Sequence, residues 1–116
     1  LRYTQAVFDN GQAVPMISPL RNIHSLQWGK PTSYIRAEAE WAAAQDRIND
    51  GFGERATPAF LIFHLRANYE LPLKATKMYM SSGIENLLNT HYREHLDWGG
   101  IPRPGRNMYV QLGWYF

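Results

Sequence analysis

The sequence predicts an all-β protein, folded as an antiparallel up-and-down meander of about six strands. Residues 107–116 read NMYVQLGWYF and alternate between apolar and polar or small side chains, which is the period of a strand with one apolar face. Similar runs recur along the chain, separated by turn residues and by connections that are alternately short and long. The sequence contains no run of about 18 apolar residues, and so no candidate transmembrane helix.

The last of these runs is the clearest, and it predicts which side chains face away from water. Its length is close to the roughly 9–11 residues that a tilted strand needs to cross a bilayer. In a soluble sheet its apolar face would need a second layer, whereas in a membrane barrel lipid covers such a face. We therefore expect its apolar side chains to face lipid: Met108, Val110, Leu112, Trp114 and Phe116.

Five further segments are expected as strands. They are residues 1–8, 21–28, 33–45, 58–70 and 76–88. In the segment 21–28, Leu26, Trp28 and His24 all lie on one side of the strand. If Leu26 and Trp28 face lipid, His24 does too, so the alternation does not decide which side faces lipid.

Residues 33–45 fit either a helix or a strand. The stretch 38–44 has high helix propensity, and a helix would place Arg36 beside Glu40, four residues further on. A strand would instead align Arg36, Glu38 and Glu40 along one face. The residues alone leave both readings open.

Alternation in the later strands predicts two faces of opposite character. The outward, lipid-facing side chains expected there are Leu61, Phe63, Leu65, Met78, Met80 and Ile84. The opposite wall, facing a lumen, is expected to carry Arg36, Glu38, Glu40, His64, Arg66 and Glu85. An arginine in mid-strand is tolerable against a watered lumen but costly against lipid. This wall is either a solvated set of mutually paired charges or a surface that contacts a plug domain or a passing ligand.

The connections between the expected strands alternate in length. Residues 9–20, 46–57 and 89–106 read as long loops, whereas 29–31 and 71–75 read as short turns. Outer-membrane barrels have short periplasmic turns and longer external loops, so the alternation favours that architecture. The long loops could contact a ligand or could be no more than soluble loop tips.

Composition limits the classes of function. The 116 residues carry a net charge of only +2, and the arginines are scattered, which gives little support for nucleic-acid binding. Cysteine is absent, so neither disulfides nor thiolate metal sites are possible. Aromatic residues make up 14% of the chain, which suits interfacial girdles and also a soluble β-sandwich.

Two arrangements of chemically active residues need an explanation. His91, Glu94 and His95 satisfy the H-x-x-E-H pattern, but zinc chemistry needs a helix there, and glycine and proline follow closely. We favour a loop in which Tyr92 and His95 pack or hydrogen-bond locally, without metal. Two carboxylates on one strand face could perform acid–base catalysis, yet such pairs are common in any polar wall, so no catalytic residue is expected.

Several sequence pieces together resemble the C-terminal part of TonB-dependent outer-membrane receptors. The pieces are GIENLL at 83–88, Tyr92 with the Glu94–His95 pair, and RPGRNMY at 103–109 before a terminal Phe116. Ala44–Arg47 and Thr57–Pro58 fit the preceding loop of that family. The resemblance runs from about Ala42 onward and is strongest over the last thirty or so residues.

The resemblance implies a fold and a function. The chain, residues 1–116, would be the C-terminal segment of a 22-stranded transmembrane β-barrel whose plug domain and earlier strands are absent. The whole protein would import bulky, scarce nutrients, such as iron–siderophore complexes or cobalamin, with energy supplied through TonB. It would not be an enzyme and would hold no cofactor or metal. Under this resemblance residues 33–45 form a strand.

The same resemblance implies location and partners. The protein would lie in the outer membrane of a Gram-negative bacterium, in contact with its lipid, with the C-terminus in the periplasm. The TonB–ExbB–ExbD complex would act on its missing N-terminal region, and the barrel-assembly machinery would recognise the last strand. The transported ligand stays unknown, and candidate ligand contacts in the last loop are Arg93, His95 and Trp98. A passive porin and a soluble β-sandwich binding module remain as alternatives.

Overall fold

The protein is all-β, with five strands in one antiparallel sheet whose spatial order follows the chain. A computed structural model describes residues 1–72, 77–97 and 99–115. The strands are β1 (Arg21–Lys30), β2 (Ser33–Ala42), β3 (Phe60–Pro72), β4 (Lys77–Glu85) and β5 (Asn107–Tyr115), and a 3-10 helix, η1 (Asp50–Phe52), lies between β2 and β3. The predicted antiparallel meander is confirmed. Among the described residues, no helix has the length and apolarity to cross a membrane.

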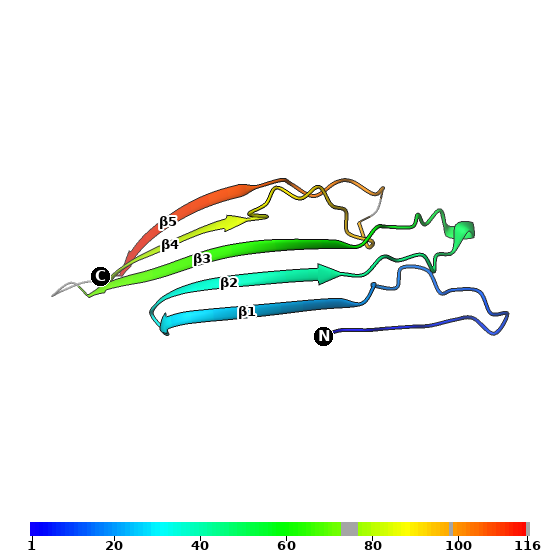
Figure 1. Cartoon of the computed structure of the whole chain (residues 1–116), viewed down its shortest axis with the longest axis horizontal. Coiled ribbons are helices and arrows are strands. Elements are labelled where there is room, and N and C mark those ends of the chain that lie inside the picture. Colours follow the sequence, from blue (N-terminus) through cyan, green and yellow to red (C-terminus); the bar gives the residue numbers. More distant parts are fainter. Residues whose placement is uncertain (73–76, 98, 116) are drawn as a thin grey trace.

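The long connections gather at one end of the sheet, as Figure 1 shows. Residues 1–20, 43–59, 86–97 and 99–106 lie at this end, which we call the loop end. Residues 31–32 join β1 to β2 at the opposite end, the turn end, where β5 also finishes. The connection between β3 and β4 was expected as a short turn at 71–75, and most of it lies outside the described residues.

One expected strand is wrong. Residues 1–8 form only two isolated bridges, Arg2 with Arg21 and Val7 with Ala13, so the sheet has five strands where about six were expected. Arg2 lies opposite the first residue of β1, and the residues after it therefore run past the end of that strand. Their neighbours there are the segment before β1, where Pro15 and Pro19 cannot donate ladder hydrogen bonds.

The other boundaries shift by a few residues. The segment 33–45 is a strand and not a helix. Its continuous ladder ends at Ala42, and the isolated bridge between Gln45 and Thr57 continues the same register towards β3. The strand expected at 76–88 ends at Glu85, because Asn86 takes a positive φ of 49° that a strand cannot continue through. The helix η1 within the loop 43–59 was not predicted.

The strand register separates the two faces as expected. Residues directly opposite each other in antiparallel strands share a face. The pairs Leu65 with Ile84 and Ile84 with Met108 place apolar side chains of three strands together. On this outward face lie Leu61, Phe63, Leu65, Met78, Met80, Ile84, Met108, Val110, Leu112 and Trp114. Phe116, expected there too, lies outside the described residues.

The register also decides the facing of β1, which the sequence left open. Leu26 lies opposite Ala37, and Trp28 lies opposite Ile35. Since Ala37 in turn faces Leu65, these side chains belong to the outward face, and His24 belongs there with them. The outward face is open to the surroundings, with Trp28 83% and Val110 70% exposed.

The small hydrophobic core lies on the opposite, inward face, at the loop end. Its buried residues are Ala42, Phe60 and Ile62, all three on the inward parity of β2 and β3. Tyr92, from the connection after β4, covers them, with its ring centroid 4.6 Å from that of Phe60. The last loop therefore folds back over the inward face.

At two places along their length, β4 and β5 fit together through an aromatic ring that lies over a glycine of the other strand. Tyr79 lies opposite Gly113, and a Cβ atom on Gly113 would stand 2.2 Å from the Tyr79 ring. Tyr109 covers Gly83 in the same way, with a Cβ there only 2.7 Å from the ring. These rings fill the space that the missing side chains leave, which favours one register over its neighbours.

We expect Gly113→Ala to lower the free energy of unfolding by about 1–3 kcal/mol, because the added methyl group must displace the Tyr79 ring. Combined with Tyr79→Ala, the same change should cost much less, and the urea unfolding midpoints of the two single variants and the double variant measure this coupling. Gln111→Ala, on the same face of β5, is the matched control. Strictly additive effects of the two changes would contradict the packing described here.

Candidate functional site

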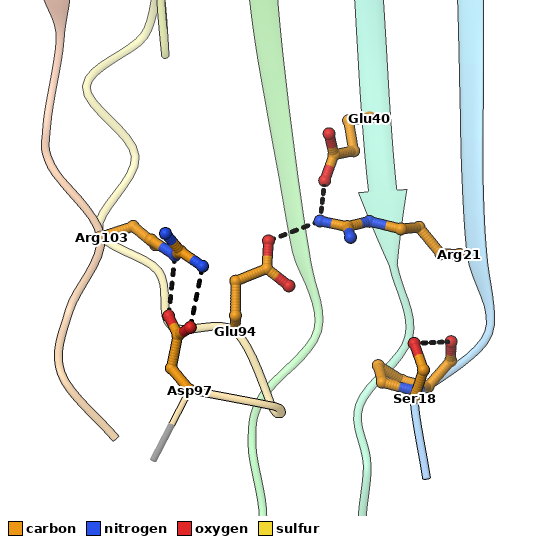
Figure 2. Close-up of polar contacts among 7 residues, drawn as sticks. Ser18, Arg21, Glu40, Glu94, Asp97 and Arg103 are labelled. Carbon is orange, nitrogen blue, oxygen red and sulfur yellow. Dashed lines mark hydrogen bonds and ion pairs between the residues drawn. The ribbon is translucent and has the colours of Figure 1, made fainter. Parts of the chain in front are cut away.

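Arg21 joins the last loop to the sheet at the loop end. Its Nη2 donates to Glu40 on β2 and to Glu94 in the last loop, the latter at 2.5 Å. Figure 2 shows Arg21 lying between the two carboxylates, with Glu94 reaching across β3 towards it. In the same loop Arg103 holds Asp97 through two contacts, of 2.7 and 2.8 Å. The Arg21–Glu94 pair fixes the loop above the inward face, and the Arg103–Asp97 pair joins two parts of the loop itself.

A buried carboxylate, Glu54, ties three connections together. It accepts a hydrogen bond from the backbone N–H of Met16 and another, of 2.7 Å, from that of Asn49. Its Oε1 also lies 3.3 Å from Nε2 of His95, whose Nδ1 is 3.1 Å from the hydroxyl of Thr57. The side chains of Glu54 and His95 are only 5% and 1% exposed. The segments before β1, before β3 and before β5 therefore meet at one point.

The surroundings of Glu54 favour its charged form. Burial alone would raise its pKa, but the N–H groups of Asn49 and Met16, together with His95, outweigh burial and lower the pKa below its ordinary value. Tyr92 nearby shows the opposite effect, since burial and the carboxylates of Glu94 and Glu40 raise the pKa of its hydroxyl.

Two of the sequence pieces quoted above, residues 83–88 and 103–109, contact each other around the last loop. Asn86 is buried, donates to the carbonyls of Thr90 and Pro104, and accepts from the N–H of Thr90. The side-chain oxygen of Asn89 accepts from the N–H of Arg106 at 2.8 Å. It would stand only 2.4 Å from a Cβ at position 105, so any other residue there would displace the Asn89 side chain from this hydrogen bond.

A cavity of about 230 Å³ opens between these connections. The buried pair Glu54 and His95 forms part of its wall, and the remaining lining residues include Met16, Arg55, Thr57, Arg93, Glu94, Asp97, Gly99 and Gly100. Most of these lining residues carry a polar or charged side chain. The arrangement suits the binding of a polar or charged group of a ligand.

The three expected ligand contacts in the last loop have different surroundings. Arg93 is half-buried and lines the cavity. His95 lines it too, but its ring is almost fully buried against Glu54 and Thr57, which gives it a role in holding the loop. Trp98 lies outside the described residues.

The H-x-x-E-H residues separate in the structure. His91 is exposed, whereas His95 is buried, and Glu94 points to Arg21. Within the ranges that the structure describes, no three or more His, Cys, Asp or Glu side chains are grouped to hold a metal ion. Tyr92 packs on Phe60 and His95 lies within hydrogen-bond distance of Thr57, which are the local contacts expected of this loop.

The inward wall expected from the sequence is a ladder of polar contacts. Arg66 reaches Glu38 on one neighbouring strand at 3.0 Å and Glu85 on the other at 3.5 Å. Arg36 donates to Gln27, with distances of 2.6 and 3.1 Å. His64 lies 3.4 Å from the N–H of Asn86. All six predicted residues share this face, with their charges largely paired.

Sequence reasoning missed several residues that form the site. Arg21, Glu54 and Asn86 were not singled out, since their partners lie far away in the chain. The only available signal was the position of Asn86 inside the GIENLL piece. No spacing in the sequence indicates that Glu54 would meet His95, because the partners come from two different loops.

The comparisons with known proteins bear on the fold. No protein-family model matches the chain, and no curated protein matches it. Among solved structures, the chain is similar to the copper transporter OprC, with a TM-score of 0.75 and 22% sequence identity. The likeness covers 89% of this chain and 18% of that one, so this chain spans less than a fifth of that protein's length. At this identity the likeness shows a shared fold.

We expect Glu54→Gln to loosen the loop end and to remove its sensitivity to acid. Because the pKa of Glu54 is lowered on folding, its stabilising effect is full above the ordinary carboxyl pKa of about 4.3 and is lost as the pH falls through the lower folded value. The unsubstituted protein should therefore loosen only below about pH 4. An amide, which has one acceptor oxygen, cannot serve Met16, Asn49 and His95 together at any pH.

The loosening of the loop end is measured by the fluorescence anisotropy of a dye attached to a single cysteine that replaces the exposed Asp9. The control is Asp50→Asn, which removes an exposed carboxylate from the loop that contains Glu54. This variant should behave like the unsubstituted protein. If Glu54→Gln kept both the high anisotropy and its fall in acid, Glu54 would not be the group that holds these loops.

Proposed function

We propose that this chain is part of an outer-membrane active transporter of the TonB-dependent receptor class, and that it is not an enzyme. The division of the sheet into one exposed apolar face and one charged face carries the proposal. The fold shared with the copper transporter OprC supports it. The location we propose is the outer membrane of a Gram-negative bacterium.

The outward face would contact lipid. Large apolar side chains of all five strands stand exposed there, including Leu26, Ile35, Leu61, Met80 and Leu112. Lipid would cover them as a second protein layer does in a soluble sandwich, which is the strongest reason to prefer a membrane barrel over a soluble binding module. Unpaired backbone groups are not tolerated in hydrocarbon, so β1 and β5 would each pair with a further strand of a closed, 22-stranded barrel.

The inward wall would border a watered lumen. Arg66, with Glu38 and Glu85 on either side, is costly against lipid but stable beside water. In a receptor of this class the wall would face a plug domain encoded upstream of the chain. The TonB–ExbB–ExbD complex would act on that upstream region and supply the energy.

The transported ligand would be scarce and too bulky for passive diffusion. Iron–siderophore complexes and cobalamin are the ligand classes that the sequence resemblance implies. Copper is a further candidate, because the structural neighbour is named a copper transporter. The folded loop end, with its charged cavity, supports a surface that meets the ligand from outside.

The proposed orientation places the loop end outside the cell and the C-terminus in the periplasm, where the barrel-assembly machinery would recognise β5. Ile101 and Phe52 are 68% and 61% exposed at the loop end, and Thr32 is exposed in the turn between β1 and β2. Lys74 would be an alternative at the turn end but lies outside the described residues.

We expect single cysteines replacing Ile101 or Phe52, in a cysteine-free form of the complete gene product, to react with a membrane-impermeant maleimide in intact cells. A cysteine replacing Thr32 should react only after the outer membrane is breached. Reaction of the Thr32 position in intact cells, with the loop positions protected, would mean that the orientation is inverted.

Deletion of the gene should abolish uptake of one ligand class, and deletion of TonB should have the same effect. Uptake of radiolabelled iron–siderophore, cobalamin and copper at low external concentration measures this. Restoration by the gene in a strain with TonB, and not in one without it, is the control. Uptake that is lost with the gene but independent of TonB would indicate a passive porin instead.

A further inference from the structure

The cavity at the loop end contains charged groups of both signs, but these groups differ in their contacts. Its three carboxylates are all engaged: Glu54 with Met16 and Asn49, Glu94 with Arg21, and Asp97 with Arg103. The acidic side of the wall is therefore already neutralised or hydrogen-bonded.

The two arginines of the same wall differ from the carboxylates. Within residues 1–72, 77–97 and 99–115, neither Arg55 nor Arg93 takes part in an ion pair, and neither guanidinium donates a hydrogen bond. Each carries up to five N–H donors in a fixed planar fork. Arg55 is exposed and Arg93 is half-buried, so both side chains are accessible to a ligand.

Gly100 lies beside Arg93 in the wall of the cavity. Gly100 has a φ of 62°, and a Cβ there would stand 3.5 Å from Nη1 of Arg93. A side chain longer than a methyl group at position 100 would extend towards the guanidinium. The positive φ alone favours glycine at this position, next to the guanidinium.

We infer that the cavity is a binding site for a phosphate or carboxylate group, held by the guanidinium groups of Arg55 and Arg93. Phosphate and carboxylate oxygens match the arginine fork, and charge-assisted hydrogen bonds of this kind are strong. The volume of about 230 Å³ is below the range of about 300–1,000 Å³ typical of whole-ligand pockets. The site would therefore take one anionic group of a larger molecule or a small free anion.

The anionic group has two possible sources, a soluble ligand or the head group of a lipid, and direct binding distinguishes them. Inorganic phosphate and citrate are titrated by calorimetry into the complete gene product, purified in detergent at low ionic strength. In a second arm, the protein is incubated with phosphatidic acid, washed, and the retained lipid is counted by mass spectrometry. The inference concerns the loops alone and does not rest on the proposed transport, so a negative uptake result leaves this test intact.

The variants are Arg55→Gln and Arg93→Gln, with Arg47→Gln as the matched control. Arg47 is an exposed arginine in the same connection as Arg55, but it lines a different cavity. Each of the two test variants should weaken binding of the anion on the order of tenfold or more, while the control keeps the original affinity. Higher ionic strength should weaken binding in the unsubstituted protein, because salt screens exposed charges.

Several results would overturn the inference. Absence of binding by phosphate, citrate and phosphatidic acid would do so, as would affinities unchanged in both test variants. An equal loss in Arg47→Gln would mean a general effect of net charge. A lowered unfolding midpoint in Arg55→Gln or Arg93→Gln would assign these arginines to stability and not to a ligand. Binding of the soluble anions alone supports a free ligand, and retention of phosphatidic acid alone supports a lipid head group.

Discussion

The register of β3 against its two neighbours is the constraint on which the rest of the structure depends. Side chains alternate with a period of two along a strand, so a slip of one residue would exchange the faces completely. Arg66 on the inward side bonds to Glu38 of β2 and reaches Glu85 of β4. On the outward side, the same register sets Leu65 between Ala37 and Ile84. Each face thus supports the register that the other requires.

The loop end obtains its order from polar ties more than from apolar burial. The buried hydrophobic residues number three among those described, and they lie under Tyr92. Beyond them, Glu54 and Asn86 draw distant segments together, each with several backbone partners. A buried polar group left without its partners is costly, so loss of one such side chain affects several segments at once.

The sequence predicts much of the sheet, because alternation is a local signal. The outward positions from Leu61 to Trp114 could be assigned from period alone, and the cross-strand pairs confirm that they share one face. The strand expected at residues 1–8 fails because alternation says nothing about whether a partner strand lies beside it. The site was harder to predict, since the partners Arg21 and Glu94 are 73 residues apart and meet only in the fold.

The loop-end cavity and the ties that surround it are connected through three consecutive residues. Arg93 directly precedes Glu94 and His95, which fasten the last loop to Arg21 and to Glu54. A ligand held by Arg93 would therefore contact the loop at its most firmly fixed point, and little further ordering would accompany binding. The free energy of binding would then not be reduced by the entropy cost of ordering a mobile segment. In the inferred site, the carboxylates would therefore anchor the loops while the guanidinium groups of Arg55 and Arg93 would contact the ligand.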